Sequence, residues 1–368
     1  MITSRTRCIF EYMKKRVSFR YIALAGILFS GLISLSLVFK TTEVETKVPT
    51  QSTWVNDELG KMSLEQKIGQ FFMVAAYSNK GEAHYAHLDS LVEQQHIGGM
   101  IFFQGQRINM KTIVDRFQQK ANVPLLIGMD AEWGVQMRLF GEDRFPYNYT
   151  LGAANDPKLT KRVSEMIAQE CREIGVHINF APVADVNSNP NNPVIGFRSY
   201  GENPLDVASH VKGAVQGMEG QGVLTSIKHF PGHGDTETDS HYGLPLVENS
   251  LTQIDAIDFP PFRAGIRAGT ASVMIAHLNV PALDSTGTPS SLSPIVIKDY
   301  LQGQLGFKGL VISDALNMKA VADRYGKTEV VVKAFEAGCD ILLFPESVEE
   351  AIQAIKQKVE AGEIDMTE

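Results

Sequence analysis

The sequence has 368 residues but few cysteines, only Cys8, Cys171 and Cys339. None is spaced as in a zinc site. Cys171 and Cys339 fall in segments with regular periodicity, so we expect two buried thiols rather than a disulfide. A glycine-rich phosphate-binding loop with its following lysine is also missing. The formal net charge is -8, which argues against nucleic acid as the main partner and makes a neutral ligand the simpler expectation.

Long apolar runs are missing too, with one exception near the N-terminus. Residues 21–39 carry no charge and follow a basic segment, residues 1–20. They are long enough to span a bilayer as a helix. We expect an uncleaved signal anchor with a cytoplasmic N-terminus, and a cleaved signal peptide is the alternative. Residues 40–52 form a polar linker, and on either interpretation residues 53–368 are exported to the periplasm or the cell exterior.

After the linker, short apolar runs alternate with amphipathic helical patterns. The runs are mostly continuous, as expected for strands of a parallel sheet that helices cover. The predicted strands are residues 69–76, 99–103, 125–130, 177–183, 223–229, 272–277, 310–314 and 340–344. Among the helices, the one after Asp156 starts with a good N-cap followed by Pro157. The predicted helices are residues 157–174, 204–221, 251–268, 294–305, 329–337 and 348–361.

Eight strand–helix units favour a single (β/α)8 TIM barrel, and a doubly wound open sheet is the competing architecture. Polar residues stand at or just beyond the carboxyl ends of the predicted strands. In a barrel these ends converge on one mouth, whereas in an open sheet only those near the switch point would meet. The distribution therefore favours the barrel. The residues concerned are Asp130, Asp185, Lys228, His229, His277 and Asp314.

The segment from Lys228 to His241 combines a lysine, histidines and aspartates in a loop shaped by glycine and proline. Asp239 and His241 are two residues apart, so an extended loop could direct both side chains into one pocket. Histidine has an unperturbed pKa near neutrality, and a neighbouring carboxylate would orient it for proton transfer. The alternative interpretation is a surface loop held by Asx-turns.

Asp314 directly follows the apolar run 310–313. A carboxylate at the end of a buried strand is costly unless it is hydrogen-bonded or functional. In a barrel mouth it is a competent nucleophile toward the anomeric carbon of a sugar. The alternative is that Asp314 caps the helix that follows.

Asp130 ends the third predicted strand, and Arg138 and Arg198 lie in the predicted loops after the third and fourth strands. Charged groups of this kind suit a ligand rich in hydroxyls, and ion pairing across the barrel rim is the alternative. Histidines and aspartates at strand ends also describe metallohydrolases, but the sequence has neither a His-Glu-x-x-His helix nor a His-x-His first strand. We therefore expect no metal. A binding protein without catalysis is a further alternative.

Longer motifs make one family resemblance specific. Residues 228–241 resemble the signature loop of glycoside hydrolase family 3, and within it the β-N-acetylglucosaminidase branch. Residues 62–70, 180–187, 196–204 and 311–314 resemble further motifs of the family. The similarity covers about residues 58–344.

This resemblance implies a (β/α)8 barrel that removes terminal β-linked N-acetylglucosamine with retention, without cofactor or metal. The expected substrates are peptidoglycan fragments or chitooligosaccharides, and a β-glucosidase of the same family is the alternative. Asp314 matches the nucleophile, and Asp239 with His241 matches the acid/base dyad. The candidate sugar-binding residues are Asp130, Arg138, Arg198, Lys228 and His229, together with His277, Asp185 and Trp133.

The segment after the third strand departs from the pattern of the branch. Trp133 stands where the branch commonly has glycine, and Val135 where it commonly has arginine. A tryptophan there could stack on a sugar face and alter the preference for the leaving group. Chains with this variant resemble large cell-surface proteins that carry a C-terminal hydrolase domain of the β-lactamase type. We therefore expect this chain to be the front part of a longer protein.

Overall fold

A computed structural model of the chain describes residues 51–238 and 243–365. The predicted signal segment and the predicted dyad residues Asp239 and His241 lie outside the described residues. Within the described ranges, no helix combines the length and the apolar composition that crossing a membrane requires.

Eight strands form one parallel sheet in the order β10-β1-β2-β4-β6-β7-β8-β9. Its two outer strands meet through a backbone bridge between Ile312 and Ile341, so the sheet curls into a barrel. The predicted barrel is thereby confirmed over the open sheet, although most strands are shorter than predicted. The strands are β1 (Phe72–Ala76), β2 (Gly99–Phe102), β4 (Leu126–Met129), β6 (Ile178–Asn179), β7 (Leu224–Phe230), β8 (Ser272–Ile275), β9 (Leu310–Ser313) and β10 (Leu342–Leu343).

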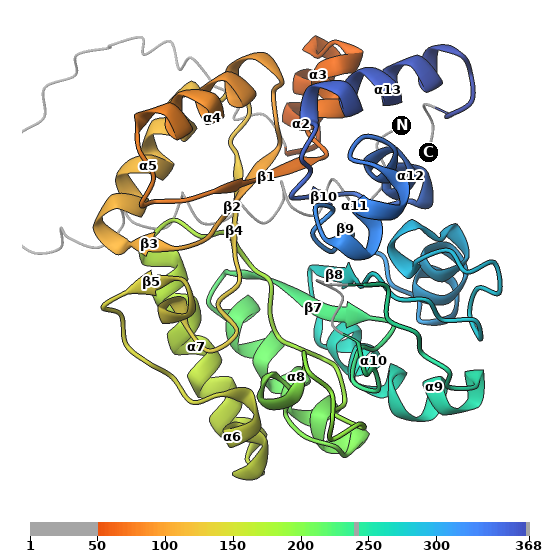
Figure 1. The fold of residues 1–368 in the computed structure, drawn as a ribbon. Coiled ribbons are helices and arrows are strands. Elements are labelled where there is room, and N and C mark those ends of the chain that lie inside the picture. The colour runs from red at the N-terminus through yellow and green to blue at the C-terminus, as the bar shows by residue number, and fades with distance from the viewer. Residues whose placement is uncertain (1–50, 239–242, 366–368) are drawn as a thin grey trace, which may run out of the picture.

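The helices surround these strands on the outside (Figure 1). Each predicted helix has a counterpart, with one correction. The predicted helix 251–268 is two helices that separate at Asp258, because Pro260 and Pro261 lack the N–H groups that would continue the first helix. The helices are α2 (Gln51–Lys61), α3 (Leu64–Gly69), α4 (Glu82–Gln94), α5 (Arg107–Lys120), α6 (Asn148–Ala153), α7 (Pro157–Glu173), α8 (Pro204–Gly220), α9 (Leu251–Ile257), α10 (Phe259–Ala268), the π-helix η4 (Ile295–Gln304), α11 (Lys319–Tyr325), α12 (Glu329–Ala337) and α13 (Val348–Glu360).

Some elements were not predicted. Helix α2 begins at Gln51, the next-to-last residue of the predicted linker. A second, two-stranded parallel sheet joins β3 (Gly105–Gln106) to β5 (Leu139–Phe140) at the edge of the barrel. The two thiols behave as expected, since Cys171 and Cys339 are both buried and free.

The inside of the barrel is filled rather than hollow. Along β9, Leu310 and Ile312 belong to the inner cluster while Val311 faces the helices, as strand alternation requires. Gly128 on β4 leaves room for the ring of Phe180, because a Cβ atom there would lie 2.9 Å from the ring. This packing closes the barrel from below and leaves space for a ligand at the carboxyl ends of the strands.

Candidate active site

A cavity of about 590 Å³ opens at the carboxyl ends of the strands. Its base is the top of the barrel core, since Ile101, Met274 and Leu343 line it. Segments from β2 to β10 contribute its walls, so residues far apart in sequence share one space. The charged, imidazole and amide side chains that line it are Asp130, Glu132, Arg138, Arg198, Lys228, His229, His233, Asp314, Asn317 and Lys319.

Asp130, directly after β4, is held by two cations. Lys228 of β7 donates to its Oδ1 at 2.7 Å, and Arg138 donates to its Oδ2 at 2.8 Å. Burial by itself would raise the pKa of Asp130, but the charges of Lys228 and Arg138 lower it below its usual value. The carboxylate is therefore ionised and fixed at the cavity wall.

Glu132 lies two residues further and is completely buried. Arg198 donates to both of its oxygens, at 2.7 and 3.0 Å, and Lys228 Nζ is 2.7 Å from Oε1. Although burial opposes it, the charge of Arg198 and then that of Lys228 hold the pKa of Glu132 well below its usual range. Glu132 was not among the predicted site residues. Its spacing from Asp130 was the available signal.

His229 follows Lys228 on β7, and its ring is fixed from both sides. Nδ1 lies 2.7 Å from Oδ2 of Asp185, and Nε2 lies 3.2 Å from the Arg198 guanidinium. Because arginine can only donate, Nε2 accepts and Nδ1 carries the proton that it donates to Asp185. Asp185 also accepts the backbone N–H of His233 at 2.8 Å. Asp185 thus holds the segment from His229 to His233, which we call the histidine loop, and does not itself line the cavity.

Asp314, directly after β9, lines the cavity. Its Oδ1 accepts the backbone N–H of Ala315 at 2.7 Å. Burial would raise the pKa of Asp314, but His277, His229, this backbone donor and Lys228 lower it. An ionised carboxylate with a low pKa is the state that a nucleophile needs.

His277 lies behind this turn. Its Nε2 donates to the carbonyl of Ala315 at 3.0 Å, while Nδ1 is 2.6 Å from the Ser291 hydroxyl. The side chain of His277 is fully buried and does not line the cavity. It therefore supports the backbone next to Asp314.

The cavity brings together seven of the residues predicted from sequence. They are Asp130, Trp133, Arg138, Arg198, Lys228, His229 and Asp314. Asp185 and His277 stand behind this group, and Asp239 and His241 lie outside the described residues. The apolar wall residues Phe103, Met318 and Phe344 were not predicted, because an apolar residue in or after a strand gives no signal that separates it from the core.

Residues 63–368 match the family described as "Glycosyl hydrolase family 3 N terminal domain". The chain belongs to glycoside hydrolase family 3. Among its relatives, beta-hexosaminidase A of Pseudoalteromonas piscicida is 36% identical over 70% of this chain and 47% of that protein. A beta-N-acetylglucosaminidase/beta-glucosidase of Cellulomonas fimi is 29% identical over 84% of this chain and 56% of that protein. The chain thus spans about half the length of these two relatives.

A solved structure supports the same assignment. The glycoside hydrolase family 3 beta-N-acetylglucosaminidase of Paenibacillus sp. str. FPU-7 is 39% identical, with a TM-score of 0.79. The match covers 83% of this chain and 60% of that one. The family resemblance stated from the motifs, and with it the assignment of this chain to a family of glycoside hydrolases, are therefore confirmed.

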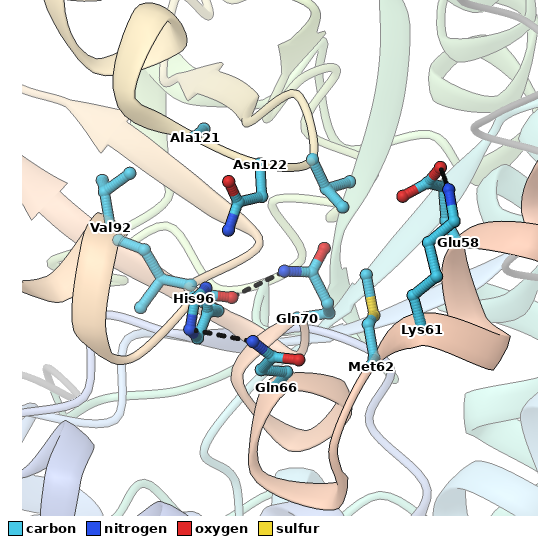
Figure 2. Close-up of a pocket in the computed structure, with 11 residues that line it drawn as sticks. Glu58, Lys61, Met62, Gln66, Gln70, Val92, His96, Ala121 and Asn122 are labelled. Carbon is cyan, nitrogen blue, oxygen red and sulfur yellow. Dashed lines mark hydrogen bonds and ion pairs between the residues drawn. The ribbon is translucent and has the colours of Figure 1, made fainter.

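A second pocket of this family 3 barrel differs in chemistry and lies at the opposite end, because residues that precede β1, β2 and β4 line it. Figure 2 shows its lining side chains. Its volume is about 340 Å³. The amide of Gln66 meets Nε2 of His96 at 3.1 Å, and Gln70 donates to the carbonyl of His96 at 2.6 Å. The amides of Gln66, Gln70 and Asn122 line it beside apolar side chains, and Lys61 forms an ion pair with Glu58.

Among residues 51–238 and 243–365, no three His, Cys, Asp or Glu side chains are grouped so that they could hold a metal ion.

Proposed function

We propose that this chain is the catalytic part of a retaining exo-β-N-acetylglucosaminidase. One observation carries the proposal: the ionised Asp314 shares a cavity with Asp130, Arg138 and Lys228, whose charged groups can bind sugar hydroxyls. The packed barrel core closes the bottom of the cavity. A glycan can therefore insert only its end, which supports removal of terminal sugars.

In the first step, Asp314 attacks the anomeric carbon and the glycosidic bond breaks, which leaves a covalent glycosyl-enzyme. The leaving oxygen needs a proton. His229 is a poor donor, because its Nε2 already accepts from Arg198 and its Nδ1 is directed to Asp185. This supports His241, oriented by Asp239, as the acid. In the second step His241 takes a proton from water, and the water attacks C1 and releases the sugar.

The activity is tested by hydrolysis of aryl β-N-acetylglucosaminide and aryl β-glucoside, with and without inorganic phosphate. We expect the N-acetylglucosaminide to be preferred and the product to keep the β configuration. A preference for the glucoside would favour the β-glucosidase alternative, which the named Cellulomonas relative makes relevant. Loss of activity on addition of a chelator would favour a metallohydrolase.

The acid/base role is tested by His241→Ala. We expect a large loss of kcat/KM on substrates with poor leaving groups and a small loss on activated aryl substrates, because only the former need protonation. Equal losses on both would argue against the dyad.

We further propose that the natural substrates are muropeptides or chitooligosaccharides and that residues 21–39 anchor an exported protein. The uncharged stretch after a basic segment supports the anchor. Membrane fractionation of cells that express the full chain, with protease added from outside, tests both the anchoring and the side of the membrane. A further C-terminal domain in the complete protein is also part of this proposal.

A further inference from the structure

Three aromatic side chains from two loops stand together, and one of them, Trp133, lines the catalytic cavity. Trp133 and Tyr147 belong to the segment after β4, and Phe197 belongs to the turn Gly196–Arg198 after β6. The ring centroids of Trp133 lie 5.0 Å from Tyr147 and 5.8 Å from Phe197, and those of Tyr147 and Phe197 are 4.6 Å apart. Each ring contacts the other two, and we refer to them as the aromatic cluster.

The buried ion pair of the active site positions this cluster. Trp133 directly follows Glu132, and Phe197 directly precedes Arg198. Two hydrogen bonds, of 2.7 and 3.0 Å, join Glu132 to Arg198. Asn148 adds a third tie between the loops, since its amide donates to the carbonyl of Arg198 at 2.8 Å. The rings are therefore held in place before any ligand arrives.

The local backbone is also specific to this arrangement. Gly134, after Trp133, has a φ of 96°, and a Cβ atom there would lie 2.5 Å from the ring of Phe145. On the other side, the Arg144 guanidinium lies 5.1 Å from the centre of the Tyr147 ring and donates to its hydroxyl at 2.7 Å. The turn that presents Trp133 thus requires glycine, and Tyr147 is fixed by a cation.

The cluster is more exposed than a core cluster would be. Phe197 leaves 53% of its surface open to solvent. Trp133 lines the cavity and continues into an apolar wall with Met137 and Val194. Apolar surface left in water at the mouth of a cavity costs hydration free energy and commonly marks a ligand-binding surface.

We propose that Trp133, Tyr147 and Phe197 form a leaving-group subsite on which the sugar after the scissile bond packs the apolar face of its ring. The inference rests on the proposed function. Under that function the buried charges around Asp130 and Lys228 bind the terminal sugar. The more exposed aromatic cluster is then available to the sugar on the other side of the scissile bond. The C–H groups on the faces of a pyranose ring are apolar and match a rigid aromatic surface.

This subsite would determine which substrates are cleaved efficiently. Binding energy from a sugar that does not react can position the reacting bond, so substrates without that sugar lose rate. The enzyme should therefore prefer an oligosaccharide to a substrate whose leaving group has no ring.

The kinetic test compares chitobiose and chitotriose with β-N-acetylglucosaminyl azide, whose leaving group has no ring. In the full chain, Phe197→Ala should lower kcat/KM on the oligosaccharides by about tenfold and leave the azide within twofold. Trp133→Ala should lose more, and Trp133→Phe should recover part of the loss. Phe140→Ala, at a phenylalanine that is 68% exposed and does not line the cavity, is the matched control and should change neither substrate.

A loss equal on both substrates, or no loss on the oligosaccharides, would overturn the subsite. A binding test separates this from failure of the proposed function. The chain has two tryptophans, so in Asp314→Asn combined with Trp54→Phe only Trp133 reports. Chitobiose should change the fluorescence of Trp133. Phe197→Ala should weaken the affinity for chitobiose about tenfold and leave the affinity for N-acetylglucosamine unchanged. Binding without turnover in the unmodified chain would disprove the activity and keep the subsite; the absence of a chitobiose-specific response would disprove the subsite.

Discussion

The two ends of the barrel are built from the same strands but satisfy their polar groups in different ways. At the carboxyl ends, the charges of Asp130, Glu132 and Lys228 are buried together around a cavity. At the amino ends, the neutral amide of Gln66 bonds to the imidazole of His96, and the amide of Gln70 donates to the His96 carbonyl, in the pocket of Figure 2. Buried charges are costly and persist where partners or function hold them, so the comparison locates the chemistry at one end.

Loop length explains part of this difference. The segments that lead from a helix into a strand are short, as in residues 95–98 and 121–125, and have little room for functional side chains. Those that follow β4, β6 and β7 are long and supply the cavity. Barrel enzymes generally place catalysis on the loops after the strands and stability on those before them.

The largest effect is expected at Asp314. Asp314→Ala should lower kcat on aryl N-acetylglucosaminide by roughly 10³-fold or more, because it removes the proposed nucleophile. Asp340→Asn is the matched control. Asp340 accepts the backbone N–H of Val311 at 2.8 Å at the other end of the same strands, so its variant should keep kcat. Similar losses in both would remove the functional contrast between the two ends.

A smaller loss is expected at Asp185, a positioning residue. In Asp185→Asn the amide would present a donor to His229, which favours the other imidazole tautomer and places a proton against Arg198. We expect kcat/KM to fall roughly tenfold to a hundredfold. Nitrogen-15 spectra of His229 should show the proton moving from Nδ1 to Nε2. An unchanged spectrum with a lower melting temperature would mean a structural role alone.

The buried Asp258, at the catalytic end, should make the stability of the protein depend on pH. Its carboxyl packs against Gly232 of the histidine loop, and within the described ranges no group donates to its Oδ2. Burial, together with the charges of Asp185 and Asp235, raises the pKa of Asp258 from 3.8 to about 8. The folded protein thus holds a proton that the unfolded chain releases above about pH 4.

The unfolding free energy should therefore fall as the pH rises from about 4 to 8, by up to about 1.4 kcal/mol per pH unit from this group. Asp258→Asn cannot ionise, so its stability relative to the unmodified chain should increase between pH 5 and pH 8 in denaturant titrations. Asp284→Asn is the control. Burial would raise the pKa of Asp284, but hydrogen bonds from the Ser293 and Thr286 hydroxyls lower it below its usual value. Asp284 is therefore ionised in both the folded and the unfolded chain between pH 5 and pH 8, so the stability difference of this variant should stay constant. A constant difference for Asp258→Asn would contradict the prediction.

The smallest effect on activity is expected at the amino end. His96→Ala removes the contact with Gln66 and should cost about 1 kcal/mol of stability, measured as a lower midpoint of unfolding. Its kcat/KM should stay within twofold of the unmodified chain. A tenfold loss of activity would show that the two ends are coupled.

Local signals in the sequence were sufficient for the barrel and for part of the site. Continuous apolar runs predicted the strands, and a polar residue directly after such a run identified Asp130 and Asp314, since parallel strands bring these positions to one mouth. The motif around Lys228 and His229 identified these two residues of the cavity wall. The overlong strand 177–183, which shrinks to Ile178–Asn179, shows that apolar composition alone does not mark where hydrogen bonding ends.

The sequence by itself thus determined the order of strands and helices and the residue types available at the mouth, because periodicity and capping depend on near neighbours. Only the tertiary structure decided how those residues pair. Lys228 reaches Asp130 across 98 positions and Arg198 reaches Glu132 across 66, and the rings of Trp133 and Phe197 meet because of that second pair. Such partners are chosen by barrel closure and by the need to neutralise buried charge, neither of which any local segment encodes.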